Sequence, residues 1–122
     1  MKLCSGVDLI EIERVQEAIE RHGDRFLNRI FTPLELAEVL DNSASLAVRF
    51  AAKEAVAKAL GTGIGVVCWQ EIEIRRGPER QPELHLHGAA AQMAEKLGLV
   101  HWSISLSHTQ NIAIAMAVGT GE

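Results

Sequence analysis

The residues with the clearest chemical potential lie in the run RFAAKEAVAKALGTGIG, which begins at Arg49. Arg49 and Lys53 are four residues apart, and so are Glu54 and Lys58, so a helix would place each pair on one face. Cationic side chains bind phosphate, and Mg²⁺ takes one or two carboxylates together with water and phosphate oxygens. We therefore expect the two pairs to line one cleft that handles a phosphorylated substrate.

Each part of this run also has a purely structural interpretation. A pair such as Glu54 and Lys58 usually forms a solvent-exposed ion pair worth about 0.3 to 0.5 kcal/mol, although the many alanines around it indicate a buried helix. The glycines from Gly61 to Gly65 could simply end the helix and form a turn. They are not a P-loop, which precedes its helix. Close approach of a ligand to this bare backbone is the second interpretation.

Asp8 lies between Val7 and Leu9 in an apolar segment near the N-terminus. A carboxylate in such a strand needs a partner or a metal ion, because burying it unpaired costs several kcal/mol. Alternatively, Asp8 marks an exposed strand end and caps the helix that begins near Glu11. The local sequence leaves both interpretations open.

Hydroxyl and imidazole groups gather in Ser107, His108 and Thr109, at the end of a strand-like segment. They could donate several hydrogen bonds to phosphate, although hydroxyl-rich strand ends also commonly form turns. His85 and His87 would share one face of a strand. Because no third ligand accompanies them at metal-site spacing, a solvent-exposed face is the simpler interpretation.

Length and composition limit the class of protein. A chain of 122 residues with 48% apolar content, and without a repeat or a long linker, suits a single domain spanning residues 1–122. No apolar run approaches the roughly 20 residues that cross a bilayer, and a net charge of −4 argues against general nucleic-acid binding. Two distant cysteines and the lack of a cleavable leader predict a reduced, cytoplasmic protein.

The elements that must position these groups follow from the periodicity of the first half. Residues 1–10 have the pattern of a strand. The next segment repeats apolar residues at spacings of three and four, which predicts a helix that stops at Gly23. A short helical stretch is expected around residues 25–30.

Capping signals then mark two more helices. Thr32, Pro33 and Glu35 form a capping box that starts a helix running to about Leu40. After the polar turn Asp41-Asn42-Ser43, either Ser43 or Ser45 is expected to cap the long alanine-rich helix, which ends at Leu60.

The second half changes to the two-residue repeat of half-buried strands. Segments 72–75 and 83–87 alternate around Gly77-Pro78 and Gln81-Pro82, which predicts a hairpin. A helix follows over residues 88–97, and segments 101–108 and 112–118 favour antiparallel pairing. The order of strand, three helices, two strands, helix and two strands predicts an α+β fold with helices packed on a mostly antiparallel sheet.

Five segments together resemble the holo-acyl-carrier-protein synthase family of 4′-phosphopantetheinyl transferases. They are, in order, GVDLIEIERV, FTPLEL, RFAAKEAVAKALGTGIG, QPELHLHGAA and SISLSHTQNIAIAMAV, and they cover nearly the whole chain. Five such matches in the same order are specific, whereas any one would be common. Cys4 and Ser5 depart from the family pattern, as does the length of the loop at residues 76–82; we expect a packing adjustment that leaves the Asp8 site intact.

The resemblance implies roles for individual residues and the family's 4′-phosphopantetheinyl transferase fold. Asp8 and Glu54 match the acids that hold Mg²⁺, and Lys58 matches the catalytic lysine beside the transferred phosphate. Contacts to coenzyme A are implied for Arg49, Lys53, Gly61, Thr62, Gly63, Gly65, Ser107, His108 and Thr109. Arg14 matches the helix arginine that meets the acidic carrier protein, and Arg21 lies two turns along.

The family reaction moves 4′-phosphopantetheine from coenzyme A to a serine of apo acyl carrier protein and releases adenosine 3′,5′-bisphosphate, as a step of fatty acid biosynthesis. The residues suit it, because the protein in phosphoryl transfer mainly positions groups and neutralises charge. Arg25 and Arg29 would extend the basic docking surface. The resemblance also implies a homotrimer with active sites between subunits. Two alternatives are a Mg²⁺-dependent hydrolase of coenzyme A or another nucleotide and a non-enzymatic carrier-protein-binding module.

Overall fold

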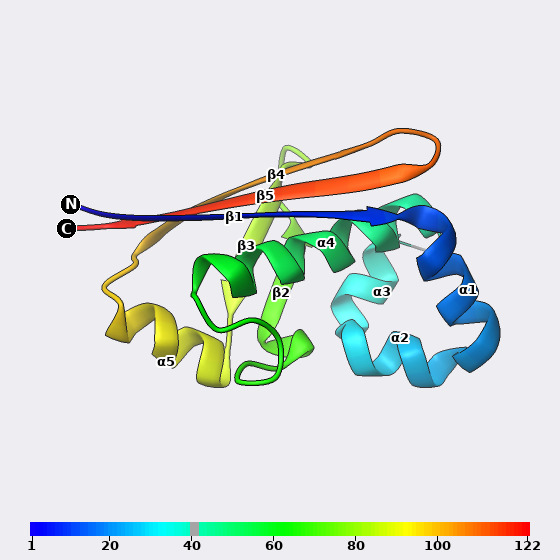
Figure 1. Ribbon diagram of the computed structural model, residues 1–122, viewed down its shortest axis with the longest axis horizontal. Coiled ribbons are helices and arrows are strands. Elements are labelled where there is room, and N and C mark those ends of the chain that lie inside the picture. The colour runs from blue at the N-terminus through cyan, green and yellow to red at the C-terminus, as the bar shows by residue number, and fades with distance from the viewer. Residues whose placement is uncertain (40–41) are drawn as a thin grey trace.

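A computed structural model describes residues 1–39 and 42–122 (Figure 1). Five helices, one 3₁₀ turn and five strands follow one another in these residues. They are β1 (Lys2–Glu11), α1 (Ile12–His22), α2 (Asp24–Ile30), α3 (Pro33–Val39), α4 (Ser43–Ala59), η1 (Trp69–Glu71), β2 (Ile72–Arg76), β3 (Pro82–Leu86), α5 (Gly88–Lys96), β4 (His101–His108) and β5 (Ile112–Gly121). The predicted α+β class and element order are confirmed, and the expected short helical stretch is the helix α2.

The strands form two antiparallel sheets. In the larger sheet the order is β1-β5-β4, and β1 pairs with β5 along its whole length, from Lys2 opposite Gly121 to Glu11 opposite Ile112. The smaller sheet is the β2–β3 hairpin. Figure 1 shows the larger sheet as a layer along one side of α4, with α5 near one end of that helix and α1, α2 and α3 near the other. The hairpin predicted from the two-residue repeat and the antiparallel pairing predicted for the last two strands are both confirmed.

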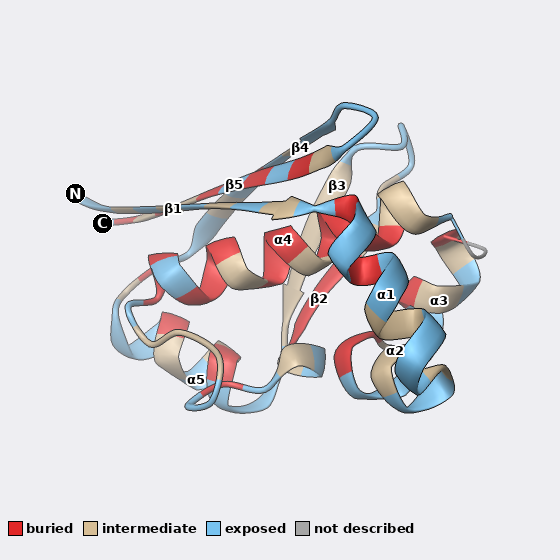
Figure 2. Cartoon of the chain, turned by 45° about the vertical axis from the view of Figure 1, so that its right-hand side comes forward, coloured by how far each residue is buried: buried red, intermediate tan, exposed pale blue. Residues whose placement is uncertain are grey.

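Helix α4 is the centre of the fold. It is the reddest element in Figure 2, and even its charged residues Arg49 and Lys53 are buried. Its many alanines allow the sheet to approach closely: a Cβ atom on Gly6 of β1 would collide with the carbonyl oxygen of Ala55. Glycine at this position therefore lets β1 lie directly on the helix, and this contact fixes which residues of the two elements face each other.

The helix ends agree with the predicted capping, with one exception. Thr32 and Glu35 form the expected capping box, in which the Thr32 backbone N–H donates to Glu35 Oε1 at 2.9 Å and the Glu35 N–H donates to Thr32 Oγ1 at 3.1 Å. The cap of α4 is neither predicted serine. Asn42 caps this helix, and its side chain accepts from the Ser45 N–H at 3.0 Å. The predicted helix end at Leu40 and the turn residue Asp41 lie outside the described residues.

The face of the larger sheet turned away from α4 carries exposed apolar side chains. Side chains alternate along a strand, so every second residue of β1 and β5 points outward, as the pale bands of Figure 2 show. Exposed fractions on this open face reach 69% for Leu3, 53% for Val7, 59% for Leu9 and 47% for Met116. Within the described residues, no helix has the length and apolar character needed to span a membrane.

Candidate active site

Asp8 and Lys58 meet where β1 crosses the last turns of α4. Asp8 lies in the interior of the strand opposite Ala115, on the face turned toward the helix. Lys58 Nζ donates to Asp8 Oδ1 at 3.0 Å and to the Val7 carbonyl at 3.1 Å. This position contradicts the alternative in which Asp8 caps α1, because the cap position belongs to Glu11. The structure therefore gives Asp8 the partner that its apolar surroundings require.

Glu54 lies one helical turn before Lys58 and lines the same cavity as Asp8, which has a volume of about 350 Å³. Burial raises the pKa of Glu54, and the neighbouring Asp8 carboxylate raises it further, while Lys58 acts in the opposite direction. Lys58 bonds with Asp8, so the expected helix ion pair between Glu54 and Lys58 is replaced by a contact between a helix and a strand. Glu54 is thus left without an ion-pair partner among the described residues, and an additional cation in the cavity would stabilise its charged form.

The donor set of this cavity is small. Among residues 1–39 and 42–122, no three His, Cys, Asp or Glu side chains lie close enough together to hold a metal ion. Two carboxylates nevertheless fit Mg²⁺, which keeps several waters and is commonly bound by one or two carboxylates plus substrate phosphates. Burial and the nearby Asp8 carboxylate both raise the pKa of Glu54, and a divalent cation held between the two carboxylates would act in the opposite direction.

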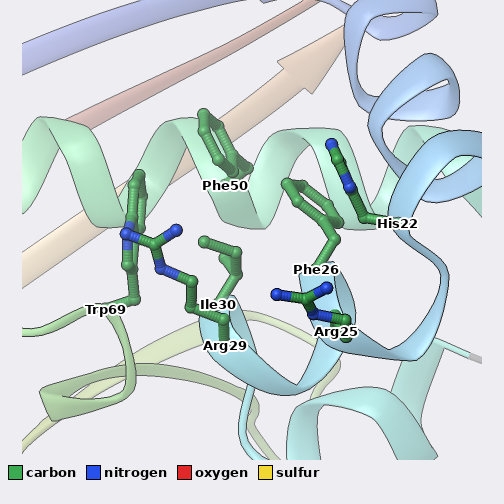
Figure 3. Close-up of a pocket in the computed structure, with 7 residues that line it drawn as sticks. All are labelled: His22, Arg25, Phe26, Arg29, Ile30, Phe50 and Trp69. Atoms are coloured by element: carbon green, nitrogen blue, oxygen red, sulfur yellow. The ribbon is translucent and has the colours of Figure 1, made fainter.

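An aromatic and basic groove adjoins the carboxylates. Arg14 lines the Asp8 cavity together with Phe26 and Phe50, and the two phenylalanines also line a second cavity of about 410 Å³. The second cavity is lined by His22, Arg25, Phe26, Arg29, Ile30, Phe50 and Trp69 (Figure 3). Arg21 is exposed on the same helix as Arg14. The arginines expected at the docking surface thus include three that border one of the two cavities.

Three aromatic rings form one wall of this groove. Phe50 lies between the other two, with its ring centroid 4.7 Å from that of Trp69 and 6.3 Å from that of Phe26 (Figure 3). Reasoning from the sequence did not assign these residues to the site. The available signal was their scarcity, since phenylalanine and tryptophan make up only 4% of the chain, but their meeting depends on the tertiary fold.

Neither Arg49 nor Lys53 lines the Asp8 cavity, contrary to the expectation of one cleft. Arg49 is buried between α3 and β2, where its Nε donates to the Ile74 carbonyl at 3.3 Å, and burial lowers its pKa. Lys53 is 0% exposed, and its ammonium group is hydrogen-bonded inside the chain. The implied coenzyme A contact of Lys53 does not match this burial, because no surface of the side chain is available to a ligand.

The glycine loop after α4 needs its glycines for conformation. Gly61, Gly63 and Gly65 have φ angles of 79°, 68° and 128°, values that other residues rarely adopt. A Cβ atom at any of the three would meet nothing within 4 Å, so open space adjoins this backbone. The amides of Gly61, Thr62 and Gly63 donate to carbonyls of α4. The structural interpretation of the loop as a helix stop and turn is confirmed, and ligand contact there stays a prediction.

Ser107, His108 and Thr109 lie across the sheet from Asp8. Ser107 belongs to the same row as Ile114, on the open face, whereas Asp8 faces α4. Two strand spacings, roughly 10 Å, separate β4 from β1. Thr109 closes the β4–β5 turn, because its Oγ1 accepts from the N–H groups of Asn111 at 3.2 Å and Ile112 at 3.0 Å. Within a single chain, Ser107 and Thr109 therefore do not meet the carboxylates, whereas His108 pairs with Ala113 and shares the α4-facing side of the sheet with Asp8, two strands away.

Known proteins share both the sequence and the fold. The model of the 4'-phosphopantetheinyl transferase superfamily matches residues 5–117. The holo-[acyl-carrier-protein] synthase of Herpetosiphon aurantiacus is 50% identical over 98% of this chain and 99% of its own length. That of Dehalococcoides mccartyi strain CBDB1 is 51% identical over 95% of this chain and 97% of its own length.

Solved structures agree with these relatives. The Helicobacter pylori holo-[acyl-carrier-protein] synthase in complex with coenzyme A has a TM-score of 0.88 at 32% identity, covering 95% of this chain and 99% of that one. The Neisseria meningitidis synthase has a TM-score of 0.87 at 35% identity, covering 96% and 97% of the two chains. Its sequence and its fold therefore both show that the chain is an enzyme that belongs to the holo-[acyl-carrier-protein] synthases of the 4'-phosphopantetheinyl transferase superfamily.

Proposed function

We propose that this enzyme transfers 4′-phosphopantetheine from coenzyme A to a serine of apo acyl carrier protein, with Mg²⁺ as cofactor and adenosine 3′,5′-bisphosphate as the second product. The observation that carries the proposal is that Asp8 and Glu54 line one cavity beside a basic aromatic groove, and that Lys58 forms an ion pair with Asp8. The phosphate would lie at the cavity, and the carrier protein would cover the groove. The expected setting is the cytoplasm, in fatty acid biosynthesis.

The residues of the cavity have distinct tasks. Asp8 and Glu54 would hold Mg²⁺, which supplies charge neutralisation at the phosphate oxygens when bound. The Lys58 ammonium group, half-exposed beside Asp8, can turn toward the diphosphate and stabilise the charge on the bridging oxygen as the bond to the leaving nucleotide breaks. The serine proton requires an acceptor, and the carboxylates of Asp8 and Glu54 are available in the cavity.

Coenzyme A contacts would come from two subunits of a homotrimer. The open sheet face, with Leu3, Val7, Leu9 and Met116 exposed, suits burial against another copy of the chain. Such packing would bring the Ser107 to Thr109 segment of one subunit toward the Asp8 cavity of its neighbour. This arrangement gives a role to residues that a single chain keeps apart, and the space beside Gly61 to Gly65 would admit the nucleotide.

The carrier protein would dock on α1 and α2. Arg14, Arg25 and Arg29 border the cavities and complement an acidic partner, although the whole chain has a net charge of −4. Between the arginines, the rings of Phe26 and Phe50 offer an apolar surface of the kind that anchors interfaces. The groove leads to Asp8 and Glu54, so a docked serine would reach the phosphate.

Intact-mass analysis tests this function directly. An apo acyl carrier protein incubated with the enzyme, coenzyme A and Mg²⁺ should gain the mass of one phosphopantetheine group, and chelation by EDTA should prevent the gain. Glu54→Ala should abolish transfer, whereas the matched control Glu95→Ala, an exposed acid on α5, should not. Rapid cleavage of coenzyme A without carrier protein would favour a hydrolase. Carrier binding with no mass gain under any condition would favour a binding module.

A further inference from the structure

Lys53 is a buried cation without a task in the proposed reaction. Its side chain is 0% exposed and all three of its N–H donors have acceptors. Nζ lies 2.8 Å from Glu35 Oε1, 3.1 Å from the Trp69 carbonyl and 2.6 Å from the Ile72 carbonyl. Burying a charge is costly unless its hydrogen bonds are complete, and burial does lower the pKa of Lys53. Because burying this charge is costly, we expect a structural role of Lys53 that accounts for it.

Glu35, the partner of Lys53, extends the network to two further elements. Its Oε1 also accepts from the Thr32 N–H at 2.9 Å, at the start of α3, and its Oε2 accepts from the Ile74 N–H at 2.8 Å, in β2. The ion pair therefore ties α3, α4 and β2 together. The Lys53 bonds to the carbonyls of Trp69 and Ile72 add the η1 turn that connects α4 with β2.

The same bonds fix the aromatic wall of the groove. Lys53 holds the backbone of Trp69, whose ring packs on Phe50 at 4.7 Å and through it on Phe26 at 6.3 Å. The η1 turn is held from the other side by Gln70, whose Nε2 donates to the carbonyls of Asn28 and Phe31 at 2.6 and 2.9 Å. Figure 3 shows Trp69 at one end of the wall, and Trp69 is the first residue of the η1 turn.

We infer that Lys53 is a positioning residue for the carrier-facing groove: through the Trp69 carbonyl and Glu35 it fixes the wall formed by Trp69, Phe50 and Phe26. The inference rests on the proposed function in one respect, namely that the groove receives the carrier protein. It assigns Lys53 to recognition of the protein substrate, with no contact to coenzyme A. The loss of Lys53 should therefore affect the two substrates unequally.

The test uses a parent enzyme with Trp102→Phe, in which Trp69 is the sole tryptophan, because the chain has two. Lys53→Met in this parent should raise KM for apo acyl carrier protein about tenfold, which corresponds to roughly 1.4 kcal/mol, and leave kcat and KM for coenzyme A within about twofold. Trp69 fluorescence should shift to longer wavelength and become more open to acrylamide quenching. Ile104→Val, a core change in β4 away from the groove, should lower stability without either effect.

Other outcomes would overturn the assignment. A higher KM for coenzyme A with an unchanged KM for carrier protein would show direct ligand contact, and unchanged Trp69 fluorescence would show that Lys53 does not hold the wall. If Lys53→Met fails to fold, the double variant Lys53→Met/Glu35→Gln, which removes both charges of the buried pair, tests the inference by the same measurements. If the wild type and the parent both transfer nothing, the proposed function fails. Fluorescence anisotropy of labelled apo carrier protein still gives Kd in that case. Equal Kd values for parent and variant would refute the inference separately.

Discussion

The ammonium nitrogen of Lys58 lies 3.0 Å from Oδ1 of Asp8, joining two residues fifty positions apart in the chain. This bond crosses from α4 to β1, and Glu54 faces the same cavity without a lysine of its own. The Lys58 ammonium group therefore competes with a divalent cation for the Asp8 carboxylate.

Replacing Lys58 should separate metal binding from transfer. Because the ammonium group competes for Asp8, Lys58→Gln should bind Mn²⁺ more tightly than the wild type in the absence of coenzyme A, as measured by electron paramagnetic resonance. Transfer should nevertheless fall at least about 100-fold, since charge stabilisation of the leaving group is lost. Stability should change by less than about 1 kcal/mol for this half-exposed pair. Lys96→Gln, on α5, is the control; weaker Mn²⁺ binding by Lys58→Gln would contradict competition.

Gly6→Ala should disturb the cavity from outside it. The new methyl group would collide with the Ala55 carbonyl, forcing β1 away from α4 at a cost of about 3 kcal/mol. Transfer should fall as Asp8 moves from Lys58. At Gly77, by contrast, an added methyl group would meet only the flexible ends of Gln81 and Glu83, so Gly77→Ala should lose less than about 1 kcal/mol. Urea unfolding measures the loss of stability in each variant. Equal losses for Gly6→Ala and Gly77→Ala would show that the close contact of β1 with α4 is not the cause.

Glu73 should contribute stability that disappears in acid. Burial acts to raise its pKa, but hydrogen bonds with Thr32, His87 and Arg75 outweigh burial and lower the pKa to about 2 from the ordinary value of 4.5. A lowered pKa in the folded state stabilises the protein above the unfolded value and is lost as the pH falls through the folded one. The free energy of unfolding of the wild type should exceed that of Glu73→Gln by roughly 1.5 to 3 kcal/mol at pH 7.

That difference should shrink between pH 4.5 and pH 2, the two values that bound the shift. Unfolding by urea at pH 7, 4.5 and 2.5 measures it, with Glu79→Gln, in the exposed β2–β3 turn, as the control. A difference between wild type and Glu73→Gln that stays constant with pH would show that the lost stability comes from shape and not from charge.

The open sheet face should govern assembly. Met116→Asp places a charge at its centre and should convert a trimer, with three times the 13.3 kDa of one chain, into monomers in sedimentation analysis. Transfer should fall as well, because sites between subunits would be lost. Leu97→Asp, at the end of α5 and 38% exposed, provides a matched charge elsewhere. A wild type that sediments as a monomer would refute the proposed trimer.

Much of the fold could be predicted because local patterns and tertiary structure agree. The repeat of α1, the Thr32–Glu35 capping box and the alternation of β2 and β3 each depend on residues close together in the chain, and all are present. The cap of α4 was assigned wrongly because Asn42 and the nearby serines are all good caps. Local sequence cannot choose among them, since the choice follows from where the first turn begins.

The site was less accessible to prediction because it depends on contacts between distant residues. A lysine in a helix normally reaches solvent, so the burial of Lys53 could not be foreseen without Glu35, which lies 18 residues earlier and in another helix. The aromatic wall likewise joins α2, α4 and η1. Which face of β4 carries Ser107 depends on the pairing register with β5, where a shift of one residue reverses every side chain.

The adjacent positions of Lys53 and Glu54 on α4 have a consequence for how such enzymes can change. One residue belongs to the interior network and the next to the cavity, so the helix that holds the core together also carries the chemistry. Selection for heat resistance and selection for faster chemistry would therefore act on the same seventeen residues of α4. Variation should be freer on the exposed arginine-bearing surfaces of α1 and α2, which can adapt to a partner without loosening the core.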